Sequence, residues 1–171
     1  IEKLVSTVEV PKMSDTSEVV TVNRGDTVSW RLNYNNTGTH FVDDMTIRDE
    51  LPKGLDIVPG SMLLTTAAGN ETLPDTALNS GGVNVGDYTP QGNGVIRFST
   101  VVNTDPEVCK LTNWAFARSN NVKEVKDDAM IIIRDCKIEE PIYVCTDLIA
   151  VLSEGNTYKF TVEAIAENGA T

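Results

Sequence analysis

Hydrophobic and polar residues alternate along short segments of this chain, and turn-forming residues separate the segments. The clearest segment is 27–34, in which four apolar residues alternate with four polar ones: Val28, Trp30, Leu32 and Tyr34 against Thr27, Ser29, Arg31 and Asn33. Successive side chains of a strand point to opposite faces, so this alternation predicts a strand with one buried face. Gly25 before it and Gly38 after it favour turns, because glycine adopts backbone conformations that other residues resist.

Similar alternation predicts further strands along the first 135 residues. We expect them at Thr7–Val10, Ser17–Val22, Met45–Asp49, Met62–Thr66, Val95–Val102, Thr112–Arg118 and Ala129–Ile133. The stretch 67–90 is long and polar, which predicts a loop that carries short strand fragments. No segment has helical periodicity. Many short strands separated by turn signals predict an all-β, immunoglobulin-like β-sandwich over residues 1–137.

The alternating pattern restarts after Asp135. Two apolar–polar runs, Ile142–Leu152 and Thr157–Ala166, are joined by the turn-forming residues 153–156, which predicts a β-hairpin. A lone hairpin is only marginally stable in water, so it must dock on the first domain, pair with another chain or begin a further module. We favour the third interpretation, in which residues 138–171 are the truncated start of a following immunoglobulin-like repeat.

Composition and charge narrow the functional classes. Of 171 residues, 40% are hydrophobic, which is enough for a packed core. The formal net charge is −11, from 25 acidic and 14 basic residues, and such a surface repels nucleic-acid backbones and anionic lipids. No run approaches the roughly 18 apolar residues that cross a bilayer. We therefore expect no nucleic-acid partner and no direct membrane insertion.

The residues that usually hold metals or cofactors are sparse. Three cysteines, Cys109, Cys136 and Cys145, allow at most one internal disulfide, and their pairing is left open. A single histidine and the absence of metal-ligand spacing predict no metal and no cofactor. The acidic pairs 43–44 and 127–128 lack the regular spacing of calcium ligands and are interpreted as solvated turns. No nucleophile context is present, so the chain is predicted not to be an enzyme.

Three polar residues fall on the apolar phase of their predicted strands: Lys12, Asp49 and Asn113. Polar groups inside a core need partners, so an amine, an acid and an amide in this position are predicted to meet one another. The alternative is that Lys12 extends to water from a strand end, while the other two make ordinary hydrogen bonds.

Six blocks of sequence resemble the conserved-repeat family called DUF-eleven. They are RGDTVSW at 24–30, NYNNTG at 33–38, IRDELPKGL at 47–55, VPGS at 58–61, GDY at 86–88 and LTNWA at 111–115, and the resemblance spans residues 5–135. It implies an immunoglobulin-like repeat of a large exported bacterial protein. Related fimbrial and adhesin domains commonly carry an internal Lys–Asn isopeptide bond assisted by an acid. The resemblance therefore implies a crosslink between Lys12 and Asn113, with Asp49 as the proton shuttle.

Trp114 and Phe116 lie on the opposite phase from Asn113. They are a candidate interaction surface for a neighbouring domain or a ligand. Packing beneath the 67–90 loop is the equal alternative.

Together these features predict a structural stalk or spacer repeat at the extracellular surface or cell wall of a bacterium. Its partners would be neighbouring repeats of the same protein. The alternative is an adhesin-type binding module that recognises a host protein or glycan through its loops or through the Trp114 and Phe116 face.

Overall fold

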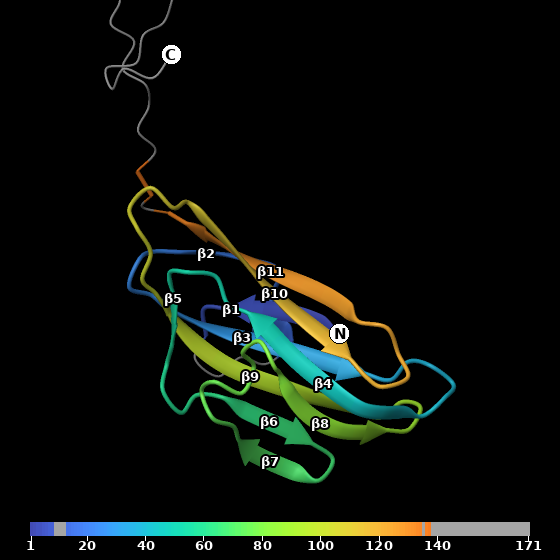
Figure 1. Cartoon of the computed structure of the whole chain (residues 1–171). Coiled ribbons are helices and arrows are strands. Elements are labelled where there is room, and N and C mark those ends of the chain that lie inside the picture. Colours follow the sequence, from blue (N-terminus) through green and yellow to red (C-terminus); the bar gives the residue numbers. More distant parts are fainter. Residues whose placement is uncertain (9–12, 135, 138–171) are drawn as a thin grey trace, which may run out of the picture. The chain divides into compact units, whose positions relative to one another are not determined.

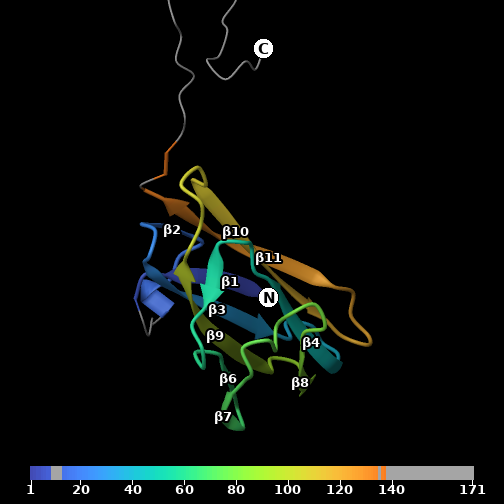
Figure 2. The same cartoon turned by 60° about the vertical axis from the view of Figure 1, so that its left-hand side comes forward.

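The alternating segments form strands in two sheets that pack face to face (Figure 1, Figure 2). The computed structural model describes residues 1–8, 13–134 and 136–137. The first sheet has the strand order β1-β3-β9-β6-β7, and β5 also pairs with β9. Its strands are β1 (Glu2–Ser6), β3 (Thr27–Asn35), β5 (Leu55–Ile57), β6 (Leu63–Thr66), β7 (Gly69–Thr72) and β9 (Asn93–Val102).

The second sheet has the order β2-β11-β10-β4-β8. Its strands are β2 (Val19–Val22), β4 (Val42–Glu50), β8 (Val83–Tyr88), β10 (Lys110–Arg118) and β11 (Val125–Ile133). Strand β2 pairs with β11 in parallel, whereas the other pairings of the two sheets are antiparallel. The predicted all-β sandwich is confirmed, and the polar stretch 67–90 carries β7 and β8, as the sequence indicates.

The first strand differs from the prediction. Thr7 and Val8 lie outside any strand, and the remainder of the predicted segment 7–10 lies outside the described residues. The N-terminal strand is instead β1, which pairs with β3 so that Val5 lies opposite Trp30. Both of these side chains are fully buried, whereas Val8 is 45% exposed. Burial of apolar surface against β3 therefore favours the earlier segment.

An aromatic pair lies at the centre of the inner face of the first sheet. Trp30 on β3 and Phe98 on β9 are paired across the two strands, with ring centroids 6.4 Å apart. The indole Nε1 of Trp30 donates a hydrogen bond of 2.9 Å to the Thr100 hydroxyl, which satisfies its polar atom in the core. These rings form a rigid wall that faces the second sheet.

The two ends of the sandwich are chemically different. At one end the start of β1 lies beside the start of β11, where the Lys3 backbone N–H donates a 2.7 Å hydrogen bond to Asp127 Oδ2. At the other end a disulfide joins Cys109, just before β10, to Cys136, just after β11. In Figure 1 the chain accordingly leaves β11 far from the N-terminus.

The chain divides into two units, Ile1–Lys137 and Ile138–Thr171. The predicted hairpin at 142–166 falls in the second unit and lies outside the described residues. Within the described part, no helix has the length and apolar character needed to cross a bilayer.

Candidate crosslink site

A lysine is buried between the two sheets. Lys3 lies on β1 opposite Leu32, and its residue surface is 0% exposed. Its side chain points inward because it shares the strand phase of Val5, the core residue of β1. The Lys3 Nζ atom lies 5.3 Å from the ring centroid of Trp30 and 5.8 Å from that of Phe98. The aromatic wall therefore holds the amine on one side.

The second sheet supplies an acid and an amide on the same inner face. Asp49 on β4 lies opposite Ala115 on β10, and Asn113 is two residues from Ala115 on the same phase of β10. Asn113 is itself opposite Ala129 on β11. Such diagonal neighbours on one face are within reach of each other's side chains. The two alanines are small, which leaves room for the lysine that arrives from the first sheet.

The amine and the acid are in direct contact. Lys3 Nζ donates a hydrogen bond to Asp49 Oδ2, and both side chains are almost completely buried. Burial lowers the pKa of Lys3 to about 8, although the charge of Asp49 opposes this shift. Burial also raises the pKa of Asp49 above its ordinary value, while Lys3 and the Asn113 side chain oppose the rise. For both groups the low-polarity surroundings outweigh the partner, and the neutral amine and neutral acid are favoured relative to water.

The amide is buried without satisfied polar atoms. Neither Nδ2 nor Oδ1 of Asn113 makes a hydrogen bond of normal geometry among the described residues, and the same holds for Asp49 Oδ1, although the Asn113 side chain is close enough to Asp49 to oppose the rise in the pKa of that acid. Asn113 is fully buried, so water does not replace these partners at its surface. An unsatisfied buried polar atom costs about 1–3 kcal/mol, which makes an asparagine a poor choice for packing alone at this position.

The structure therefore brings together two of the three residues predicted from sequence, Asp49 and Asn113, and places a lysine beside them. That lysine is Lys3, which was not among the residues predicted from the sequence. Lys12 lies in the segment 9–12, outside the described residues. The signal that could have identified Lys3 is that it shares a strand phase with the apolar residues Ile1 and Val5. This pattern is short because Lys3 is the third residue of the sequence.

Trp114 and Phe116 lie on the outer face of the second sheet, each beneath a cation. The Arg48 guanidinium lies 3.5 Å from the ring centroid of Phe116, and Lys126 Nζ lies 4.4 Å from that of Trp114. Phe116 is only 9% exposed, so the aromatic face offers less apolar surface than the sequence pattern suggests. Among the contacts described for these rings, the cover comes from β4 and β11 rather than from the 67–90 loop.

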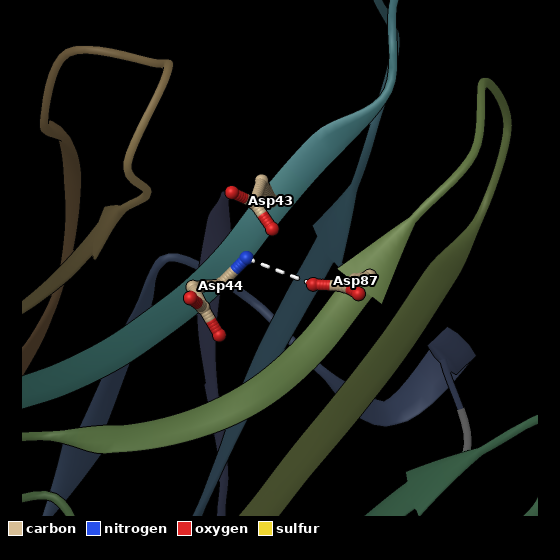
Figure 3. Close-up of side chains that lie close together, drawn as sticks. All are labelled: Asp43, Asp44 and Asp87. Atoms are coloured by element: carbon tan, nitrogen blue, oxygen red, sulfur yellow. Dashed lines mark hydrogen bonds between the residues drawn. The ribbon is translucent and has the colours of Figure 1, made fainter.

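Three exposed carboxylates gather where β4 and β8 meet, as Figure 3 shows. Oxygen atoms of Asp43, Asp44 and Asp87 lie within 4.8 Å of one another. The Asp44 backbone N–H donates a 2.9 Å hydrogen bond to Asp87 Oδ1, and the Asn84 and Asn120 side chains donate to Asp44. Protein donors thus already engage the group, and we assign it no ligand.

The sequence suggested that two acidic pairs lie in solvated turns, but both pairs lie in strands. Asp43 and Asp44 belong to β4, and Asp127 and Asp128 belong to β11, where both are half-buried. A shift of register between β4 and β8 accompanies the first pair, and Asp44 has a positive φ of 52°. Pairing with neighbouring strands therefore overrides the turn preference of aspartate at both places.

A groove of about 410 Å³ opens at the N-terminal end of the sandwich. Its apolar lining includes Ile1, Tyr34, Met45 and Val125. Lys3, Asp49 and Asn113 do not line it, so the groove is separate from the buried cluster.

Comparison with known proteins gives distant structural likenesses. No protein-family model matches the chain, so the resemblance to DUF-eleven repeats stays a prediction. No curated protein matches it either.

Among solved structures, the chain is similar to the collagen-binding domain from a Staphylococcus aureus adhesin, with 18% identity and a TM-score of 0.42. That match covers 66% of this chain and 93% of the other. It is also similar to the collagen-binding subdomain of the Enterococcus faecalis surface protein ACE, with 13% identity and a TM-score of 0.39, covering 67% of this chain and 92% of the other.

A third similar structure comprises domains D2 and D3 of the major pilin SpaD from Corynebacterium diphtheriae. It has 16% identity and a TM-score of 0.44, and the match covers 75% of this chain and 49% of the other. At these low values, no role of this chain is inferred from the likenesses.

Proposed function

We propose that this chain is a structural stalk or spacer module of a bacterial surface protein, and that it crosslinks itself through an isopeptide bond between Lys3 and Asn113. The observation that carries the proposal is the buried contact of Lys3 with Asp49, beside an asparagine whose amide makes no hydrogen bond of normal geometry among the described residues. An amine, an acid and an amide are the three groups that such a bond requires.

The chemistry follows from the protonation states that burial favours. The neutral Lys3 amine attacks the side-chain carbonyl carbon of Asn113 while protonated Asp49 polarises the carbonyl oxygen. A C–N bond forms from Lys3 Nζ to Asn113 Cγ, and the bond from Cγ to Nδ2 breaks. Asp49 accepts a proton from the attacking nitrogen and returns one to the departing nitrogen. The products are a secondary amide and one molecule of ammonia, with no oxidant or cofactor.

The fold supplies the proximity that an ordinary amide lacks. Fixed groups on rigid strands react as if at an effective concentration on the order of 10⁵ M or more in favourable intramolecular cases. The aromatic wall of Trp30 and Phe98 limits the motion of the amine and excludes water. Each molecule reacts once, so the step is a maturation of the module rather than enzyme turnover.

The bond would close a loop of about 110 residues (113 − 3). By analogy with the loop entropy of disulfides, it would stabilise the fold by about 4–5 kcal/mol. A purely structural Lys–Asp pair is the competing explanation. It accounts for the contact between Lys3 and Asp49 but leaves the unsatisfied Asn113 without a reason, because an apolar residue would fill the position at lower cost.

A location outside the cell fits two further observations. The Cys109–Cys136 disulfide is typical of oxidising compartments. The net charge of −11 keeps an exposed module soluble and apart from anionic lipid. Neighbouring repeats of the same protein are the partners that a spacer module implies.

Intact-mass spectrometry of the full chain tests the proposal. Under reducing conditions we expect a native mass lower than the sequence mass by one ammonia, and peptide mapping should find Lys3 joined to Asn113. Asp49→Ala and Asn113→Ala should each restore the uncrosslinked mass, with folding checked by circular dichroism. Lys3→Ala should also restore it, whereas Lys12→Ala should not. A native mass without the loss would leave a plain spacer domain, and loss that depends on Lys12 would move the bond to that residue.

A further inference from the structure

We propose that the isopeptide bond and the disulfide act in series, so that tension applied between the two ends of the module bypasses most of the sandwich. The inference rests on the proposed function, because one of the two links is the Lys3–Asn113 bond. It adds a mechanical property that neither link has alone, and it makes that property sensitive to reduction.

The positions of the links along the chain suggest the arrangement. Lys3 is two residues from the start of the described chain, and Cys136 is one residue from the last described residue. Their covalent partners, Asn113 and Cys109, lie only four residues apart (113 − 109) at the start of β10. Tension that enters at Ile1 would cross to Asn113, run along four residues to Cys109, and leave through Cys136.

The extended conformation of β10 makes this short path inextensible. Residues 110–113 already belong to a strand, which is close to the full length of the chain. The start of β1 lies next to Asp127, and Cys109 lies at the far end of β11, where its carbonyl accepts a hydrogen bond of 2.8 Å from the Ile133 N–H. The path from Asn113 to Cys109 therefore runs along the second half of β11, from the level of Ala129 to that of Ile133, toward the exit.

The segments outside this path are shielded. Residues 4–108 form a closed loop on one link, and residues 114–135 form a closed loop on the other. Neither loop can lengthen the tether while both links are intact. The isopeptide bond alone would leave β11, the last strand of the described residues, free to peel from β10, and the disulfide prevents this.

In single-molecule force spectroscopy, each combination of closed and open links should give a different increase in the contour length of the tethered chain. The full chain would be tethered at Ile1 and Thr171, with Cys145→Ser in every arm so that one disulfide pairing is available. Residues 138–171 contribute equally to all arms. Dithiothreitol reduces the disulfide to two thiols and is itself oxidised to its cyclic disulfide.

With both links closed, the described unit should show no unfolding step. After reduction, the 23 residues from Asn113 to Cys136 (136 − 113) should add about 80 Å of contour length, less the folded separation of their ends. In oxidised Asn113→Ala, the 106 residues from Lys3 to Cys109 (109 − 3) should add about 370 Å. Reduced Asn113→Ala should release all 133 residues (136 − 3), or about 460 Å.

The mass of each sample separates the two hypotheses. If the mass shows no loss of ammonia, the proposed function fails, and the oxidised wild-type chain should lengthen like Asn113→Ala. If the mass shows the bond but the oxidised wild-type chain still gives a long step, or reduction adds no step of about 80 Å, the series arrangement is wrong.

A second inference comes from a different contact. We propose that Asp127 is a positioning residue for the crosslink, because its carboxylate holds the strand that carries Lys3. Strand β1 belongs to the first sheet, whereas Asp49 and Asn113 belong to the second. The hydrogen bond of 2.7 Å from the Lys3 N–H to Asp127 Oδ2 joins β1 directly to β11 of the second sheet.

The contact sets position and charge together. A bond to the backbone of Lys3 fixes the start of its side chain relative to Asn113, which is opposite Ala129 on the same β11 strand. The charged groups near the amine are Asp49 on β4 and Asp127 on β11, with Asp128 on the outer phase of β11, and the negative charges of these groups raise the pKa of Lys3 against the lowering by burial.

Three variants separate these roles in a refolding assay that follows ammonia loss by mass. Asp127→Ala should slow crosslinking about tenfold or more, because the Lys3 amine is then no longer held in the orientation that the reaction needs. Asp127→Asn keeps an acceptor oxygen and should restore the rate, with the pH profile moved to lower pH because a negative charge is gone. Asp128→Asn should shift the profile similarly without slowing the reaction at its optimum. Crosslinking of Asp127→Ala at the wild-type rate, or of Asp127→Asn as slowly as the alanine variant, would overturn the positioning role.

Discussion

Arg48 and Asp49 are consecutive residues of β4, and each forms an ion pair on a different face of the same sheet. Asp49 points inward to Lys3, where both side chains are almost completely buried. Arg48 points outward, where it contacts Glu50 and Glu124 and covers the ring of Phe116. The two pairs have the same charges and nearly the same backbone position, so burial is the main difference between them.

Burial reverses the effect of pairing on protonation. On the outer face, the hydrogen bond that Arg48 donates to Glu50 raises the pKa of Arg48, so the pair strengthens the charged state. On the inner face, desolvation lowers the pKa of Lys3 and raises that of Asp49, so the charged state is weakened. The same kind of contact is therefore a surface ion pair on one side of β4 and a candidate nucleophile and acid on the other.

The largest effect should follow from removing the inner amine. Lys3→Met keeps the apolar stem and should abolish the crosslink, because no other described lysine contacts Asp49. The free energy of unfolding should fall by about 4–5 kcal/mol through loss of the closed loop. Denaturant unfolding followed by fluorescence measures this change.

Arg48→Met is the matched control for that substitution, because it removes the cation of the outer ion pair, which lies next to Asp49 on β4. It should leave the mass at the crosslinked value and change stability by no more than about 1 kcal/mol. Equal losses of stability in the two variants would contradict the difference between the faces.

A smaller, graded effect should appear in the pH dependence of crosslinking. In the reactive state the Lys3 amine is neutral and Asp49 carries the one titratable proton of the pair. The pair holds one such proton between its two pKa values, so the rate should be greatest in that pH range. Above the Lys3 pKa of about 8 the pair loses this proton. The rate should then fall about tenfold for each further pH unit. At low pH the amine is protonated and the rate should fall again.

Dilution of denatured, uncrosslinked chain into buffers of different pH, with masses recorded over time, measures this profile. Arg48→Met should give the same curve, because the outer pair takes no part in the reaction. A rate that keeps rising well above pH 8 would show that the acid is not needed in its protonated form.

The smallest effect is expected on the outer face. Glu124→Gln removes one charge from the Arg48 pair, in which the Glu124 side chain is 39% exposed. Exposed pairs contribute little because water and salt screen them, so stability should change by about 0.5 kcal/mol or less. Thermal melts at low and high salt check this, and a loss comparable to that of Lys3→Met would mean that the outer pair is not solvent-screened.

Local alternation was sufficient to predict much of the fold. The pattern of 27–34 predicted β3, and that of 112–118 predicted most of β10 with Asn113 on its inner face. Both strands are long, and one phase of each faces the core, which is the condition under which period-two reasoning works. The same reasoning identified Asp49 as an inward acid.

The lysine could not be assigned in this way. Lys3 belongs to a five-residue strand at the start of the sequence, and its apolar phase contains few residues. Lys12 falls in a stretch with a similar pattern, so alternation alone does not distinguish the two. What identifies Lys3 is that β1 pairs with β3 and also lies beside β11, which are contacts between residues more than 20 positions apart.

By itself, the sequence determined the class of fold, the inward phase of Asp49 and Asn113, and the limit of one internal disulfide, because these depend on local periodicity and on counting. Only the tertiary structure decided which amine meets the acid, which cysteines pair and how deeply the cluster is buried. Those properties depend on the packing of two sheets, and packing sets both the distances between remote side chains and the polarity that shifts their pKa values.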